Sequence, residues 1–261
     1  MLRVKKLINI IMFIVLALSV FGYRAVSAQF DSEPEEKIIV TKKRDVTGDG
    51  KKERISIVGI PYEQDSAFLR EINLVVEVKD GKKVNLPLDA GFDPKLHFAD
   101  FNGDGLKDVY VTISTGSSGG LINSYAYTFT GGKAKDLSVP PPVSITGQFL
   151  DNYKIVMSVP LQKPLVLDVS NRKKDYIKLG MYQKNGKLNE PTEVMVDPYS
   201  LFNITKISGK RKGLKGVQRV SGAYHADALT DIYSEWEYRD GNWQLLKTKT
   251  KEITKKSMRG L

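Results

Sequence analysis

Short runs of alternating apolar and polar residues follow one another along most of the chain, separated by turn-forming residues. Residues 72–78, 84–88 and 125–129 show this alternation, and residues 38–40 and 55–58 are rich in β-branched side chains. Successive side chains of a strand point to opposite faces of a sheet, so this pattern is typical of strands. No segment after the N-terminal 36 residues has the spacing of a long amphipathic helix. We therefore expect an all-β fold.

Tight-turn signals separate several of the strand-like runs: Asp80-Gly81, Asn185-Gly186 and Asp240-Gly241. Glycine adopts positive φ at no steric cost, which suits the turn of a β-hairpin. The sequence therefore predicts antiparallel strands joined by hairpins. The last hairpin joins residues 233–238 to residues 243–246, whose alternation places aromatic side chains on one face and charges on the other.

Three consecutive prolines, Pro140, Pro141 and Pro142, interrupt the strand pattern. They cannot lie inside a sheet, because none of the three has an N–H to donate. We expect a rigid connector at this point. It joins either two units of one domain or two smaller β domains.

The N-terminus has the pattern of a secretory signal peptide. Arg3, Lys5 and Lys6 precede an apolar run at residues 7–21, and Val26-Ser27-Ala28 has the small-x-small form of a cleavage site. The apolar run is shorter than the ~20 residues that a spanning helix needs. An uncleaved membrane anchor is the alternative.

This pattern divides the chain into three parts. We expect a signal peptide at residues 1–28, a flexible acidic leader at residues 29–36 and the β domain at residues 37–255. The mature protein is then secreted or cell-wall-associated, with no transmembrane span. The chain has no cysteine, which excludes disulfides, cysteine-bound metals and thiol catalysis.

The net charge is +10, of which +6 remains without the four basic residues of residues 1–28, and it indicates either a solvated lysine-rich surface or a role in binding an anionic partner. Cell-wall polymers and lipid head groups fit an exported protein, whereas no nucleic-acid fold signature accompanies the charge, so we expect no nucleic acid. Residues 206–215 are strongly basic and predict an exposed loop or hairpin tip. This segment either is merely solvated or contacts an anionic polymer.

Residues 100–108 read Asp-Phe-Asn-Gly-Asp-Gly-Leu-Lys-Asp, and residues 45–53 repeat this arrangement 55 positions earlier. Both segments place oxygen-bearing side chains at positions 1, 3, 5 and 9 and glycine at positions 4 and 6. Calcium takes six to eight oxygen ligands, and the glycines allow a short loop to wrap around it. The sequence predicts structural Ca²⁺ held by Asp100, Asn102, Asp104, the Leu106 carbonyl and Asp108, and by Asp45, Thr47, Asp49 and Glu53.

The second loop has the better ligand set. It offers three carboxylates and one amide, whereas the first offers Thr47 at position 3 and carries Lys51 and Lys52 beside the ligands. Magnesium prefers a stricter octahedron with fewer protein ligands, so calcium is favoured. Alternatively, both loops are turns held by Asx hydrogen bonds without a metal.

Residues 100–109 resemble the calcium loop of FG-GAP/VCBS repeats, which build integrin-α-like β-propellers. The resemblance covers about residues 38–130, and the rest is similar, more loosely, to exported VCBS-like proteins of Gram-positive bacteria. It implies a β-propeller-like assembly of about four or five small antiparallel blades, at roughly 40–50 residues per blade. The alternative is two smaller β domains joined at Pro140–Pro142.

Candidate catalytic residues are few. Residues 116–120 fit the Gly-x-Ser-x-Gly pattern, but a nucleophile elbow must join a strand to a helix, so we expect a flexible turn here. His97 lies in an apolar run and is expected to be a packed strand residue. Tyr224, His225 and Asp227 form either part of a turn before the last hairpin, or a ligand pocket or weak acid–base pair.

The sequence therefore predicts a secreted calcium-binding β protein that acts as a binding or scaffold module at the cell envelope, with no catalytic role. Its partner is an anionic cell-wall polymer or another envelope protein. One alternative is an envelope hydrolase with a site near His225 and Asp227. Another is a structural protein held to anionic polymers by its lysines.

Overall fold

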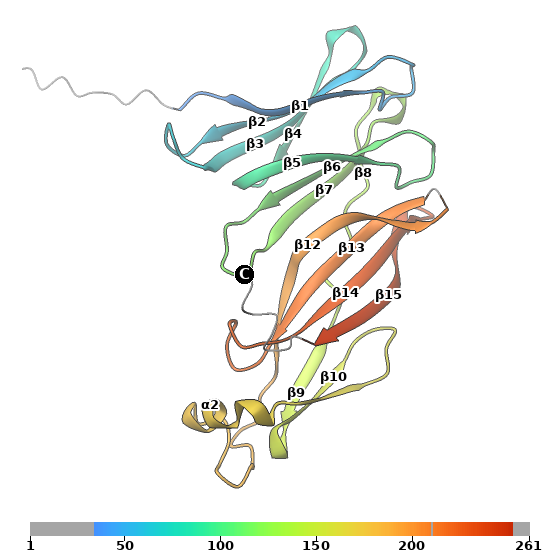
Figure 1. The fold of residues 1–261 in the computed structure, drawn as a ribbon. Coiled ribbons are helices and arrows are strands. Elements are labelled where there is room, and N and C mark those ends of the chain that lie inside the picture. The colour runs from blue at the N-terminus through green and yellow to red at the C-terminus, as the bar shows by residue number, and fades with distance from the viewer. Residues whose placement is uncertain (1–33, 210, 253–261) are drawn as a thin grey trace, which may run out of the picture. The chain divides into compact units, whose positions relative to one another are not determined.

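The computed structural model describes residues 34–209 and 211–252. This part of the chain forms three antiparallel sheets and one short helix, α2 (Lys173–Lys178), which confirms the all-β class (Figure 1). The predicted signal peptide, residues 29–33 of the predicted leader and residues 253–255 of the predicted domain lie outside the described residues. None of the helices described is both long enough and apolar enough to span a membrane.

The first sheet has eight strands in the order β1-β2-β3-β5-β6-β7-β8, with β4 paired to β3. β3 pairs with β4 over residues 72–77 but with β5 only at Phe68 and Leu69. The sheet is therefore two four-stranded meanders joined at one short contact. The first contains β1 (Lys37–Arg44), β2 (Glu53–Pro61), β3 (Phe68–Glu77), the 3-10 turn η1 (Lys79–Gly81) and β4 (Lys83–Leu88). The second contains β5 (Gly91–Ala99), β6 (Asp108–Ser114), β7 (Ile122–Thr128), η2 (Thr130–Gly132) and β8 (Lys135–Asp136).

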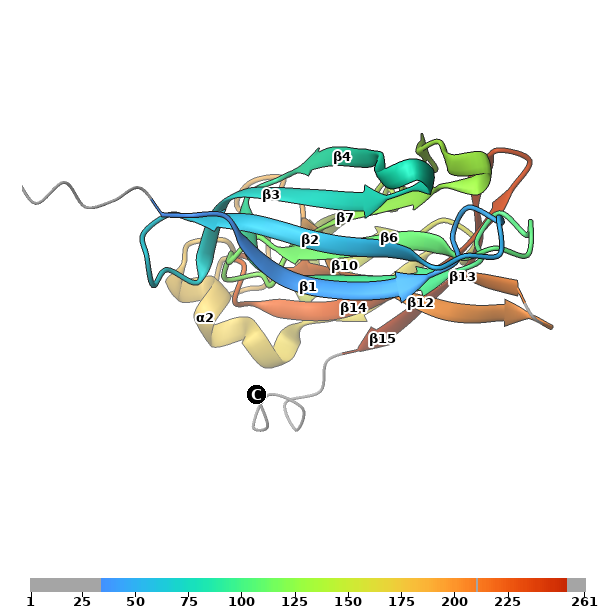
Figure 2. The same ribbon diagram turned by 90° about the horizontal axis from the view of Figure 1, so that it is seen from above.

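Each meander repeats the same order of elements, with a long loop after its first strand and a 3-10 turn before its fourth. Figure 2 shows β1, β2, β3 and β4 side by side in this order. The repeat of the loop sequence thus reflects a repeat of structure.

Two further sheets follow the prolines. A three-stranded sheet has the order β11-β10-β9 and contains β9 (Thr146–Leu150), β10 (Lys154–Ser158) and β11 (Leu165–Asp168). A four-stranded sheet in sequence order contains β12 (Met195–Ser208), β13 (Arg211–Ser221), β14 (Ala228–Arg239) and β15 (Asn242–Glu252). The 3-10 turns η3 (Asp151–Tyr153) and η4 (Ser170–Arg172) lie in the connections.

Alternation along β6 places two hydrophobic clusters on opposite faces of the second meander. Val109, Val111 and Ile113 pack into a cluster with residues of β2 and β3. Tyr110 points the other way and belongs to a second cluster, and its hydroxyl donates a 2.6 Å hydrogen bond to the Phe202 carbonyl on β12. β6 is therefore buried on both faces.

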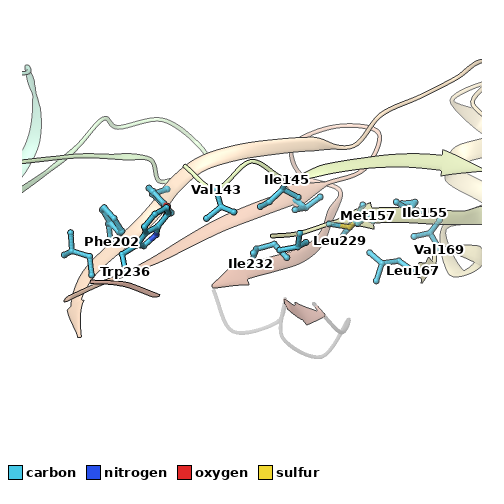
Figure 3. Packing of buried hydrophobic residues seen from close by; sticks show 14 of the residues in the cluster. Val143, Ile145, Ile155, Met157, Leu167, Val169, Phe202, Leu229, Ile232 and Trp236 are labelled. Carbon is cyan, nitrogen blue, oxygen red and sulfur yellow. The ribbon is translucent and has the colours of Figure 1, made fainter. Parts of the chain in front are cut away.

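The second cluster continues into the sheets that follow the prolines. Ile155 and Met157 of β10 and Leu229 and Ile232 of β14 belong to it (Figure 3). Because residues on both sides of Pro140–Pro142 share this cluster, the described residues form one compact unit rather than two domains with separate cores. The prolines lie outside the strands, as expected.

The predicted propeller is wrong. The three sheets of the described residues have free edges, and none closes into a ring of blades. The reason lies in the number of repeats: two four-stranded meanders cannot close a ring, and the 14-residue strand β12 and 11-residue strands β13 and β15 form a larger sheet of another kind.

Two of the three predicted hairpin turns are confirmed. Asp80 and Gly81 have positive φ in η1, between β3 and β4, and Asp240 and Gly241 have positive φ between β14 and β15. Asn185-Gly186 also forms a turn, but in the irregular segment between α2 and β12. Residues 206–209 and 211–215 of the basic segment lie at the end of the β12–β13 hairpin.

Candidate metal site in two aspartate–glycine loops

The two predicted metal loops occupy equivalent places in the repeated meanders. Residues 45–53 connect β1 to β2, and residues 100–108 connect β5 to β6. The loops also approach one another, because a Cβ placed on Gly48 would lie 2.9 Å from Leu106 Cδ1. Gly48 has a φ of +83°, a backbone conformation that favours glycine.

The first aspartate of each loop holds the loop closed. Asp45 Oδ1 and Oδ2 accept hydrogen bonds from the N–H groups of Gly48 and Gly50, at 2.8 and 3.0 Å. The second loop repeats this, with distances of 2.7 and 3.1 Å to Asp100 from Gly103 and Gly105. The glycines at positions 4 and 6 therefore have a defined role: their positive φ values turn these N–H groups toward the aspartate.

Positions 5 and 9 follow the same rule. Asp49 Oδ1 accepts the N–H of position 7 at 2.8 Å, and Asp104 Oδ1 does so at 2.9 Å. At position 9, Glu53 Oε2 accepts the N–H of position 2 at 2.9 Å, and Asp108 Oδ2 does so at 2.7 Å. The two loops therefore have the same internal framework of carboxylates turned inward.

The first loop gathers its carboxylates most closely. One oxygen each of Asp45, Asp49 and Glu53 lies within 4.8 Å of the others. Oxygens on opposite sides of a calcium ion are about 4.8 Å apart, since each lies ~2.4 Å from the ion. Thr47 donates its hydroxyl to Glu53 Oε1 at 3.3 Å and its N–H to Oε2 at 3.2 Å. The loop that the sequence ranks lower thus has the carboxylate spacing of a cation site.

The second loop holds a buried carboxylate oxygen without a hydrogen bond. Asp108 is 0% exposed, and its Oδ1 has no hydrogen-bond partner among the described residues. Burial, which outweighs the hydrogen bonds to this carboxylate, raises the pKa of Asp108 to about 6. A buried charged oxygen without a partner is costly, and a bound cation would remove that cost.

Asp104 faces a different neighbour. Its Oδ2 accepts a 2.6 Å hydrogen bond from the Thr130 hydroxyl and a 3.1 Å hydrogen bond from Asn102 Nδ2. Partial burial raises the pKa of Asp104, but these hydrogen bonds and the Leu106 N–H outweigh it and hold the pKa below its ordinary value. The Asp104 side chain is therefore already bonded to Asn102 and Thr130, unlike the Oδ1 atom of Asp108.

The turn η2 connects both loops. While the Thr130 hydroxyl bonds to Asp104, the Gly131 N–H donates a 3.0 Å hydrogen bond to the Thr47 carbonyl in the first loop. Together with the contact between Gly48 and Leu106, this makes the two loops neighbours at one end of the repeated sheet. Sequence reasoning missed Thr130, because only the fold brings it to a loop 26 residues away.

The donor set fits a hard divalent cation. Carboxylate, amide, hydroxyl and carbonyl oxygens are the ligands that calcium prefers. The first loop would hold it through Asp45, Asp49 and Glu53, and the second through the free Asp108 oxygen with Asp100, Asn102 and the Leu106 carbonyl. The ion would supply charge neutralisation and cross-linking within each loop.

His225 and Asp227, the proposed hydrolase residues, do not bond to each other. The His225 side chain is 72% exposed, and its Nδ1 lies 3.1 Å from Asp197 Oδ1. Asp227 is buried instead in a network in which Arg172 binds Oδ1, and the Tyr176 hydroxyl donates to Oδ2 at 2.6 Å. Burial, and then Asp227, raise the pKa of Tyr176. Asp227 is an anchor between η4, α2 and the start of β14.

The other residues considered for catalysis lie in the expected elements, but His97 is not packed as expected. It lies on β5 with an exposed side chain, and its ring centroid is 6.2 Å from that of Tyr110. The partial burial of its ring, followed by the charge of Lys95, lowers the pKa of His97. Residues 116–120 form the connection between β6 and β7, without a helix.

The fold and the loops define an all-β protein with a duplicated oxygen-rich loop. Residues 143–251 match the family model described as "YybI C-terminal domain". The chain is 29% identical over 205 residues to "Uncharacterized protein YybI" of Bacillus subtilis (strain 168). The aligned region covers 74% of this chain and 76% of that protein. No solved structure matches.

These comparisons correct the family assignment. The similarity is to YybI and not to FG-GAP/VCBS repeats, so the resemblance based on residues 100–109 is wrong. The physical reason is that a nine-residue loop of this kind is shaped by its own hydrogen bonds and by cation geometry, so unrelated folds can carry it. The matched C-terminal segment begins after both loops.

Proposed function

We propose that this chain is an exported, calcium-stabilised β protein that acts as a binding or scaffold module at the cell envelope. The observation that carries the proposal is the buried Asp108 Oδ1, which has no hydrogen-bond partner among the described residues. The close carboxylates of Asp45, Asp49 and Glu53 support it independently. Export is supported by the pattern of residues 1–28.

The binding role is supported by the positive charge of the chain and by the hydrogen bonds that Asp227, one of the two hydrolase candidates, makes in the structure. The basic chain would meet an anionic wall polymer or another envelope protein. A hydrolase is less well supported, because Asp227 is bonded to Arg172 and Tyr176 and not to His225. In this proposal the calcium loops stabilise the module and do not themselves carry a reaction.

Thermal unfolding in calcium and in chelator tests the proposal. A ligand that binds only the native state stabilises it by about 2.7 kcal/mol at 100 times its Kd. For a chain of this size, we expect calcium to raise Tm by roughly 5–10 °C for each occupied loop. The measurement is differential scanning calorimetry of the same preparation in excess calcium and in excess EGTA.

A matched pair of variants gives the control. Asp49→Asn with Asp108→Asn removes one carboxylate from each loop and should reduce the calcium effect on Tm. Asp65→Asn with Asp175→Asn changes the charge equally at exposed positions outside the loops and should leave the effect intact. Equal Tm of the wild-type protein in calcium and in EGTA would contradict the calcium proposal.

A further inference from the structure

One face of the four-stranded sheet carries a basic hollow of about 390 Å³, which lies over β13, β14 and β15. We call it the lysine groove. It is lined by Lys215, Tyr233, Glu235, Lys247, Lys249 and Lys251.

Strand geometry explains why these lysines share one face. Lys247, Lys249 and Lys251 are two residues apart on β15, so their side chains point the same way. In the register, Glu235 on β14 pairs with Lys247 on one side and with Lys215 of β13 on the other. Three ammonium groups therefore follow β15, and a fourth lies across β14.

The positive charge of the groove is only partly balanced within the described part of the protein. Glu235 lies across from both Lys247 and Lys215, and Asp231 lies across from Lys251 but is paired with Arg219 at 3.1 Å. Among the ion pairs there, none joins any of these four lysines to a carboxylate, and Glu235 is the sole acid in the lining. Lys215 Nζ instead lies 5.1 Å from the Tyr233 ring centroid. The four lysines outnumber the acids across from them, so a net positive charge remains, and a bound anion would reduce the repulsion among the lysines.

We propose that the lysine groove binds an extended polyol-phosphate polymer, which has one phosphate in each repeat. The inference rests on the proposed envelope-binding function and assigns its surface and ligand class. Alternate residues of a strand are about 6.6–6.8 Å apart, so the three lysines of β15 form a linear array of regularly spaced cations. Such an array is complementary to a linear chain of regularly spaced anions.

Neither protection of a sheet edge nor binding of nucleic acid accounts for the whole lysine groove. Lysines on an edge strand hinder edge-to-edge association, and β15 is an edge strand, but Lys215 lies on the interior strand β13. Single-stranded nucleic acid needs aromatic side chains on which bases stack. The groove has one aromatic residue, Tyr233, and Lys215 already lies over its ring.

The test measures binding of fluorescently labelled poly(glycerol phosphate) to the full chain by anisotropy, over a range of salt concentrations. Four phosphate contacts predict a slope of log K against log salt of about −3, by analogy with single-stranded nucleic acids. The variant Lys247→Gln/Lys249→Gln/Lys251→Gln should bind roughly 100-fold more weakly, at about fivefold per lysine. Its salt slope should become shallower by about 2.

A control variant removes the same charge elsewhere. Lys174→Gln/Lys178→Gln/Lys184→Gln changes three exposed lysines and should bind within twofold of wild type. The Tm of the groove variant should stay close to that of wild type in low salt, because the loss of repulsion among the lysines offsets the loss of weak surface attraction to Glu235 and Asp231. An unchanged or higher Tm would show that weaker binding does not come from unfolding.

Three outcomes would overturn the inference. Equal losses in the groove and control variants would show that binding follows overall charge. Equally tight binding of single-stranded DNA or of anionic lipid vesicles would show that the groove does not select polyol phosphate. A failure of the wild-type chain to bind the polymer in low salt would rule out polyol phosphate as the ligand of the groove. The effect of calcium on Tm would still test the stability part of the proposed function separately.

Discussion

The variant Asp108→Asn is expected to lose most of the calcium stabilisation of its loop, yet to be as stable as wild type or more stable in EGTA. Asparagine keeps an oxygen that can accept the Phe101 N–H and removes the buried negative charge. A substitution that improves the metal-free state and weakens the metal-bound state would be hard to explain without a cation at Asp108.

The magnitudes follow from burial. A pKa of about 6 for Asp108 corresponds to about 3 kcal/mol of native-state destabilisation at pH 8, where the carboxylate is ionised. If the new amide N–H makes no hydrogen bond, it destabilises the variant by about 1–3 kcal/mol, which offsets part of the gain from removing the charge. In EGTA the variant should therefore gain up to about 2 kcal/mol, whereas in saturating calcium it should lose about 2.7 kcal/mol of ligand stabilisation.

Urea unfolding at pH 8 in each medium measures both values. Asp65→Asn is the matched control, since it changes the same charge at an exposed position and should give near-zero differences in both media. A cation at Asp108 is ruled out if Asp108→Asn shifts the unfolding free energy by the same amount in EGTA and in calcium.

The variant Asp227→Ala is expected to lower the unfolding free energy by about 3–5 kcal/mol, because it leaves the Arg172 guanidinium, whose side chain is only 16% exposed, without its carboxylate. It also removes the acceptor of the Tyr176 hydroxyl and of the Ala223 N–H, which lie 2.6 and 2.9 Å from Asp227 Oδ2. For a chain of this size the loss corresponds to a fall in Tm of roughly 6–20 °C.

His225→Ala is the matched comparison for Asp227→Ala, because His225 is two residues away and its side chain is exposed. Removal of this surface contact with Asp197 should change the unfolding free energy by less than about 1 kcal/mol. Calorimetry of both variants separates an anchor from an acid–base pair. A wild-type Tm for Asp227→Ala would show that Asp227 does not anchor the fold.

Local features of the fold could be predicted from sequence. The alternation of Val109, Tyr110 and Val111 places successive side chains in two different clusters, as the period of a strand requires. The turns at Asp80-Gly81 and Asp240-Gly241 follow from the backbone freedom of glycine. The way that the sheets pack depends on contacts between distant residues, and the predicted ring was wrong for that reason.

The candidate site divides in the same way. The inward turn of Asp45 and Asp100 is a property of each nine-residue loop, so the spacing of aspartate and glycine predicts it. The burial of Asp108 is not local, because it depends on what covers β6 on both faces. The bond between Thr130 and Asp104 likewise requires the complete second meander.

The number of calcium ions bound by the wild-type chain tests the central claim most directly. Isothermal titration calorimetry should give two ions per chain, one for each aspartate–glycine loop. Extracellular calcium modules have Kd values of about 0.1–1 mM, so the titration should extend several-fold beyond that range. Two bound ions would support the account, and no saturable binding over this range would contradict it.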